Sequence, residues 1–346
     1  MWLTSSSIGR KFVMAITGVC LVLFVTFHVL MNSVALLWPV AYNMICEFLG
    51  ANWYALVASM GLAALFILHI IYALWLTVQN RRARGTDRYQ VNSRPPQVEW
   101  SSKNMLVLGI VVLAFLGVHM TQFWAKMQLQ ELVSHELTSL PEVAGVPASP
   151  AMGTLFIQLA FQQWWTPVVY IIGFVALWFH MNHGFWSMFH TIGWNNTTWM
   201  SRLKSISCWW TTIVVLLFTA QAIVFTVRAH ANYYTTNYEL QEQYGEFWND
   251  RAEALTEDFE AAAQKAMSAV DEGDMAAMQK AQINFFVEKA PAYVEEAQRI
   301  VELSKKQCPQ VSIKAVNNLS RFAQQLEQQI GYAKQLAPQE PETTNE

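Results

Sequence analysis

The stretch that decides the fold is residues 12–37, FVMAITGVCLVLFVTFHVLMNSVALL, which contains no acidic or basic side chain other than one histidine. An α-helix needs about 20 apolar residues to cross the roughly 30 Å of hydrocarbon in a bilayer. Comparable runs follow at about 53–79, 104–126, 165–188 and 206–228. The first run is too long for a cleaved signal peptide and no small-residue cleavage site follows it. The sequence therefore predicts an all-α membrane bundle of five transmembrane helices.

Composition separates this bundle from an acidic extension. Of the 346 residues, 53% are hydrophobic and only 14% are charged, whereas roughly 25% are charged in an ordinary globular protein, so a soluble enzyme is disfavoured. Residues 1–230 hold 12 Lys and Arg against 6 Asp and Glu, while residues 231–346 hold 10 against 19. We expect a transmembrane domain at 1–230, an acidic helical extension at 231–336 and a disordered tail at 337–346.

Apolar periodicity predicts three helical segments in the extension, at 239–270, 275–305 and 312–336. Pro291 should bend or split the second segment, because proline removes a hydrogen bond from a helix interior. We find no catalytic constellation in these residues.

The distribution of cations predicts the orientation. Ten of the twelve Lys and Arg residues of the bundle fall on one side of the five spans, and only Lys126 and Arg228 fall on the other. Short loops rich in Lys and Arg stay in the cytoplasm. We therefore expect a multi-pass protein of a bacterial cytoplasmic membrane, with a cytoplasmic N-terminus and a periplasmic extension.

Histidines occur inside four successive spans: His28, His69, His119, and either His180 or His183 in the fourth. An ionisable residue at membrane depth indicates function, and neutral imidazole is a common metal ligand. Four imidazoles make two bis-histidine sites, which predicts two b haems. His180 and His183 are three residues apart and share a helix face, so spacing does not choose between them.

Depth along the helices predicts how the histidines pair. At 1.5 Å per residue, those of the first and third spans lie about 24–26 Å from the cations at the inner ends of those spans. Those of the second and fourth lie about 17–18 Å from the same face. Two levels about 8 Å apart favour pairing His28 with His119 near the outside, and His69 with the fourth-span histidine nearer the cytoplasm.

Short strings around these histidines give the chain a resemblance to a known family. They are Ala-Ile-Thr-Gly at 15–18, Phe-His at 27–28, Ile-Leu-His at 67–69, Gly-Val-His at 117–119, Trp-Thr-Pro at 165–167 and His-Gly-Phe-Trp-Ser at 183–187. In order and spacing, residues 5–230 resemble the five-span diheme cytochrome b anchor of succinate dehydrogenase and fumarate reductase. The acidic extension departs from this family, whose anchor ordinarily ends soon after the fifth span.

The resemblance implies two haem b groups, with the His-Gly pair favouring His183 as the fourth-span ligand. It implies a flavoprotein subunit and an iron-sulfur subunit on the cytoplasmic face, and a quinone, usually menaquinone, as the substrate of this chain. Electrons would pass between succinate or fumarate at the flavin, the iron-sulfur clusters, the inner haem, the outer haem and the quinone. A glutamate between the first two spans serves the quinol site in the family, which implies this role for Glu47. Some members carry a glutamate two positions before the span-IV histidine, where this chain has Met181, so a transmembrane proton path of that kind is not expected.

Two other functions remain open. One is the diheme b anchor of a hydrogenase or formate dehydrogenase; the other is a membrane sensor or scaffold whose histidines only form hydrogen bonds. The sequence sets neither the direction of catalysis nor the quinone type. Beyond the lipid bilayer and the two soluble subunits we expect a second copy of the complex as a partner, and no nucleic acid.

Overall fold

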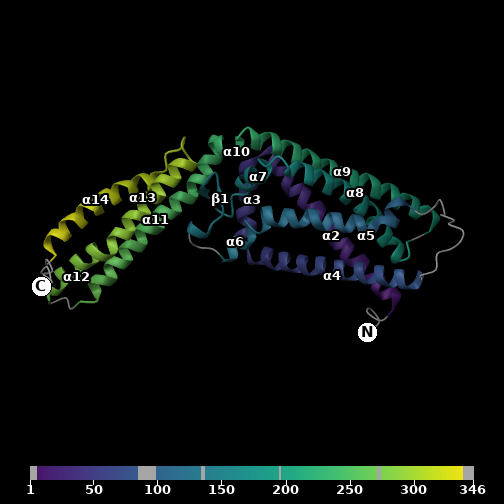
Figure 1. Cartoon of the computed structure of the whole chain (residues 1–346), viewed down its shortest axis with the longest axis horizontal. Coiled ribbons are helices and arrows are strands. Elements are labelled where there is room, and N and C mark those ends of the chain that lie inside the picture. The colour runs from purple at the N-terminus through teal and green to yellow at the C-terminus, as the bar shows by residue number, and fades with distance from the viewer. Residues whose placement is uncertain (1–5, 85–98, 134–136, 195, 271–273, 338–346) are drawn as a thin grey trace, which may run out of the picture. The chain divides into compact units, whose positions relative to one another are not determined.

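The structure, a computed structural model, describes residues 6–84, 99–133, 137–194, 196–270 and 274–337. It is almost entirely helical, which confirms the predicted all-α class (Figure 1). The chain divides into two compact units. The first comprises Met1–Ala144 and Ala148–Tyr234, and the second comprises Gly145–Pro147 and Thr235–Glu346.

The five predicted spans are present as helices long and apolar enough to cross a membrane. They are α2 (Ser7–Leu37), α4 (Trp53–Arg84), α5 (Trp100–His119) with the π-helix η1 (Met120–Trp124), α8 (Thr166–Thr191) and α9 (Thr197–His230). Several begin or end outside the apolar run, and α9 starts nine residues before the predicted boundary. There Asn196 caps the first turn, because its side-chain oxygen accepts a hydrogen bond from the Trp199 amide at 2.8 Å.

The outward faces of these helices are apolar. Side chains that are more than half exposed within this unit occur on every span, among them Leu23, Val57, Ile110, Ile172 and Leu216. In water such a surface would be a large uncovered apolar patch, whereas in a bilayer it meets acyl chains. The first unit is therefore a multi-pass membrane bundle.

Two helices lie at the centre of the bundle. α8 packs against α2, α5 and α9, and α2 also packs against α4 and α9 (Figure 1). The approach of α5 to α8 depends on Gly173, because a Cβ atom at this position would lie 2.4 Å from Cγ of Phe115. The glycine lets the α5 backbone and its side chains come close to α8.

Short elements that were not predicted lie in the connections between the spans. They are α3 (Pro39–Ala51), α6 (Gln128–Val133), the 3₁₀ helix η2 (Leu137–Ser139), the strands β1 (Glu142–Val143) and β2 (Val146–Pro147), and α7 (Gly153–Phe161). The α3 and α7 helices are too short to cross a bilayer. They are joined by Asn43, whose Oδ1 accepts hydrogen bonds from the backbone N and Oγ1 of Thr154, each at 2.9 Å.

The acidic extension forms a helical unit. Its helices are α10 (Tyr233–Thr236), which spans the boundary between the units, α11 (Tyr238–Ser268), α12 (Met275–Asn284), the π-helix η3 (Phe285–Lys289), α13 (Ala290–Gln307) and α14 (Lys314–Leu336). The predicted second segment runs through α12, η3 and α13, and Pro291 lies in the first turn of α13, where proline is tolerated. Of the expected disordered tail, residues 338–346 lie outside the described residues.

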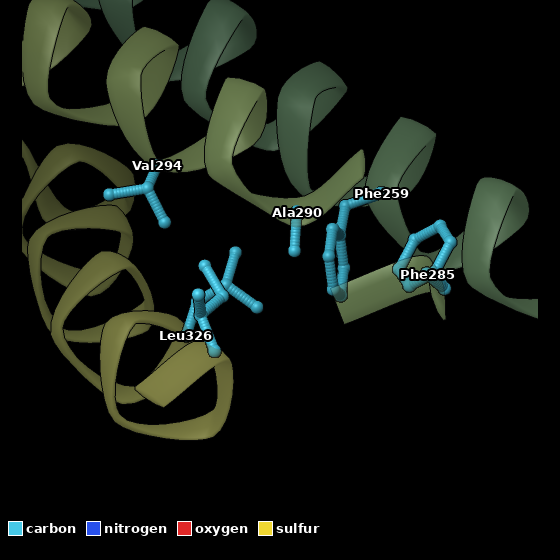
Figure 2. Packing of buried hydrophobic residues seen from close by; sticks show 6 residues of the cluster. Phe259, Phe285, Ala290, Val294 and Leu326 are labelled. Carbon is cyan, nitrogen blue, oxygen red and sulfur yellow. The ribbon is translucent and has the colours of Figure 1, made fainter. Parts of the chain in front are cut away.

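A small aromatic core holds this second unit together. Phe259 of α11 packs against Phe285, and Val294 and Leu326 complete the cluster (Figure 2). Phe322 also packs against Phe259. The unit also includes Gly145–Pro147, which comes from the connection between the third and fourth spans.

Within this unit the connection is held by polar contacts. Lys306 donates from Nζ to the carbonyl oxygen of Gly145 at 3.2 Å. Buried Trp248 donates from Nε1 to Oε1 of Gln307 at 2.6 Å, and Gln307 donates from Nε2 to the carbonyl oxygen of Pro147 at 3.5 Å. The extension is thus tied to the connection between the third and fourth spans as well as to the end of the fifth span.

Candidate functional site

Two pairs of histidines meet inside the membrane bundle. His28 on α2 and His119 at the end of α5 have ring centroids 5.7 Å apart and rings nearly perpendicular at 88°. His69 on α4 and His180 on α8 have ring centroids 6.3 Å apart with an interplanar angle of 65°. The first span is thus paired with the third, and the second with the fourth.

In the fourth span it is His180, and not His183, that faces His69. Residues three apart on a helix differ by about 60° in direction and about 4.5 Å in height. His183 instead lies with its Nδ1 atom 3.5 Å from Oε2 of Glu99, and its ring is 4.7 Å from that of Trp186. The resemblance favoured His183 as a ligand, whereas the geometry places it beside a carboxylate.

Glu99 organises a charged cluster at this end of the bundle. Its Oε1 atom accepts a hydrogen bond from Nζ of Lys204 at 2.7 Å, and that ammonium lies 4.4 Å from the Trp186 ring centroid. Burial alone would raise the pKa of Glu99, but Lys204 and His183 hold it below its usual value. The carboxylate is therefore stabilised in its charged form, and it orients both neighbours.

The two histidine pairs lie at well-separated levels. Thr17, whose Oγ1 is 3.1 Å from Nδ1 of His69, marks the level of that pair on α2, and His28 is eleven residues or about 16 Å further along. On α8, Tyr170 lies at the level of the other pair and is ten residues or about 15 Å from His180. Two helices give the same separation.

This separation is about twice the predicted one. The predicted depths were taken from cations at the inner ends of the first three spans and from Trp194 at the end of the fourth, as if these residues all lay at one level. His69 is about 18 Å from Arg81 along α4, whereas Thr17, at the same level on α2, is about 9 Å from Lys11. The α4 helix therefore extends beyond the level of Lys11, and Arg81 lies about 9 Å further than Lys11 from the level of the His69 pair.

Both pairs fit bis-histidine ligation of a haem iron. With metal–nitrogen distances of about 2 Å and ring nitrogens about 1.2 Å from their centroids, two coaxial imidazoles have centroids about 6.4 Å apart. The observed separations are 5.7 and 6.3 Å. In addition, Nδ1 of His180 is buried and makes no hydrogen bond to the described residues. The His69–His180 separation matches the coaxial spacing, and the His28–His119 rings would have to move about 0.7 Å apart to reach it.

A metal ion without a haem would need at least three ligating side chains close together. Across the described residues, no group of three or more His, Cys, Asp or Glu side chains is placed to hold a metal ion. A haem needs only two protein ligands, because its macrocycle supplies the other four. Haem ligation at the histidine pairs therefore stays a prediction that the geometry accommodates.

Glu47 lies at the opposite end of the bundle from Glu99, which is the end nearer to His28. It is exposed on α3, which begins two residues after α2 ends. The carboxyl group of Glu131 on α6 fits against Gly50 of the same helix, where a Cβ atom would lie 2.9 Å from each of its atoms. Burial, and then the charge of Glu47, raise the pKa of Glu131. The structure thus adds a second carboxyl group to the predicted one.

The sequence analysis missed the hydroxyl partners of the histidines. Thr17 contacts His69, and Tyr170 contacts His119 at 3.2 Å. A signal for them exists, since each is a polar side chain inside an apolar run. Their partners lie 52 and 51 residues away in the chain, so only the fold brings them together.

Comparisons of the chain with models of protein families, with curated protein sequences and with solved structures found no match.

Proposed function

We propose that the chain is the membrane anchor and electron-transfer subunit of a succinate:quinone oxidoreductase or fumarate reductase. The observation that carries this proposal is the pair of histidine pairs, His28 with His119 and His69 with His180, at two levels of an apolar bundle. When bound, two b haems would supply a one-electron path between these levels. The histidines would hold them, and the apolar faces of the spans would exclude water.

The ligand set in this proposal differs at one position from the one implied by resemblance. His180 takes the fourth-span place opposite His69, because its ring is the one at ligation distance. His183 would orient Glu99 and Lys204 near the inner face, where the flavoprotein and iron-sulfur subunits would bind. The dicarboxylate chemistry would belong to those subunits.

Proton exchange with the quinone is assigned to the opposite end of the bundle. Quinone reduction takes up two protons, so a carboxyl group close to the reacting oxygens assists it. Glu47 is exposed there and Glu131 lies near enough for the charge of Glu47 to raise its pKa. A carboxyl group with a raised pKa keeps its proton to a higher pH, so it is available as a proton donor nearer neutrality. Menaquinone is the quinone that the resemblance suggests.

The membrane placement in this proposal follows the cations. The Glu99 and Lys204 end of the bundle would face the cytoplasm, and the acidic extension would be periplasmic. The extension would serve as a cap or docking module, since its helices are tied to the connection between the third and fourth spans.

The test is purification of the tagged chain with its bound partners, followed by reduced-minus-oxidised absorption spectra and a haem assay. The proposal predicts two b haems per chain, a flavoprotein in the complex, and reduction of haem on addition of succinate. Two haems without a flavoprotein or a response to succinate would instead indicate the anchor of another respiratory enzyme. A preparation with no haem would favour the sensor or scaffold function.

A further inference from the structure

A chain of polar side chains runs from His119 into the interface between α5 and α8. Nδ1 of His119 lies 3.2 Å from the hydroxyl of Tyr170, and that hydroxyl donates to Oε1 of Gln122 at 2.9 Å. Gln122 then donates from Nε2 to Oγ1 of Thr166 at 3.1 Å. Tyr170 and Thr166 are both buried. Four polar groups in a membrane interior are satisfied by one another.

The local backbone helps to place this chain. Directly after His119 the helix becomes the π-helix η1, where the amide of Ala125 donates to the carbonyl of Met120 five residues before it, at 2.8 Å. Such insertions recur at functional sites in proteins. Gln122 lies in the middle of this segment, and Thr166 lies in the first turn of α8. The irregular turn thus supplies Gln122, and the start of α8 supplies Thr166, which ends the chain.

The hydrogen bonds have a definite direction. The amide of Gln122 gives its N–H to Thr166, so its oxygen faces Tyr170 and accepts the only proton of the phenol. Toward His119 the phenol oxygen can then only accept. The proton of the neutral imidazole must therefore be on Nδ1, which leaves the lone pair of Nε2 free. The reverse direction would put the proton on Nε2 and prevent ligation.

We propose that Tyr170, held by Gln122 and Thr166, is a positioning residue that fixes the tautomer of His119 and increases electron donation from its Nε2 atom. This inference rests on the proposed function, since it concerns the outer haem. A hydrogen bond from the far nitrogen of a ligating imidazole makes the ring more basic and favours the oxidised metal. The hydrogen-bonded side chains of Tyr170, Gln122 and Thr166 would thereby keep the midpoint potential of the outer haem lower than it would be without the phenol.

The inner pair has a different partner, which makes the effect specific. Nδ1 of His69 lies 3.1 Å from Oγ1 of Thr17, and that hydroxyl directs its own proton to the helix carbonyls of Val13 and Met14. A single hydroxyl that bonds back to its helix takes the place of the three-residue chain. Changes to Tyr170 should therefore act on one haem and leave the other unchanged.

The experiment is a spectroscopic redox titration of the purified complex carrying Tyr170→Phe. We expect both haems to be retained, and the midpoint potential of one of them to rise. Removing the hydrogen-bond partner of a metal-ligating side chain typically changes metal affinity or activity by about 10- to 100-fold, and we take the lower value as the expected effect. In the ratio of reduced to oxidised haem at fixed potential, tenfold corresponds to about 59 mV for one electron. The control is Tyr72→Phe, the same substitution at a buried position of α4. It should leave the midpoint potential of the outer haem unchanged.

A double variant separates electronic from structural effects. Tyr170→Phe leaves Oε1 of Gln122 without its donor, which should lower the thermal stability of the complex. Adding Gln122→Leu removes that unpaired group, so stability should recover while the potential stays raised. If Tyr170→Phe alone loses the haem, the potential of the outer haem is measured in the double variant instead. A raised potential there supports the inference, and an unchanged one overturns it.

Unchanged potentials in variants that keep both haems would overturn the role of Tyr170 and leave the proposed function intact. A wild-type complex without haem would overturn the proposed function before any variant is made. The two failures are therefore distinguishable.

Discussion

Gly173→Ala tests whether the contact between α5 and α8 holds His119 in place. The added Cβ would lie 2.4 Å from Cγ, 2.7 Å from Cδ2 and 2.8 Å from Cβ of Phe115. Contacts under 3 Å with a ring and its Cβ cannot be relieved by rotating a flexible side-chain end, so the helices must move apart or Phe115 must leave its position. Overpacking of this kind costs about 1–3 kcal/mol. That corresponds to about 5- to 150-fold in an equilibrium constant.

The displacement should reach the outer site. Phe115 lies one turn before His119, and its ring is 5.1 Å from that of Tyr170. We expect Gly173→Ala to lower the thermal stability of the purified protein and to weaken the outer haem while the inner haem is kept, both measured by absorption during a thermal ramp. The matched control is Gly117→Ala on α5, where an added Cβ meets no atom within 4 Å and should be neutral or stabilising by up to about 1 kcal/mol. Equal behaviour of the two variants would refute the close packing of α5 on α8.

Three further predictions concern the ligands, the proton site and the topology. His180→Ala should remove the inner haem while His183→Ala keeps it, as seen in reduced-minus-oxidised spectra; the opposite pattern would restore the ligand favoured by resemblance. Glu47→Gln should keep both haems and dye-linked succinate oxidation but lower quinone-linked turnover by about a hundred- to ten-thousand-fold, and near-native quinone kinetics would make it an ordinary surface carboxylate. The same variant removes a like charge, so the pKa of Glu131 should fall. A carboxyl group that gives its proton to the quinone must be protonated, so the alkaline limb of any residual turnover should move to lower pH. Protease added to intact spheroplasts should cut the extension at 231–346, whereas cleavage only in inverted vesicles would reverse the orientation.

The five spans could be predicted because each apolar run is long enough to cross a bilayer by itself. Their ends could not, because helices continue through polar residues where a cap such as Asn196 stabilises the first turn. The short α3 and α7 helices were missed for a related reason. The segments at 39–51 and 153–161 are apolar, but 13 and 9 residues are too few to cross a bilayer, so the length expected of a span excludes them.

The histidines could be found from the sequence because polar side chains are costly at membrane depth. The choice between His180 and His183 could not, since it depends on the rotation of α8, and tertiary packing sets that rotation. Likewise Glu131 reads as one of several loop carboxylates until the fold places it against Gly50. Local pattern therefore predicts which residues are unusual, and packing decides which of them meet.

The most direct measurement for the central claim is the haem content of the purified chain and of its four single histidine variants. The account predicts two b haems in the wild type, one and the same haem lost from His28→Ala and His119→Ala, and the other lost from His69→Ala and His180→Ala. A wild-type protein without two haems, or spectra in which His28→Ala and His69→Ala lose the same haem, would contradict it.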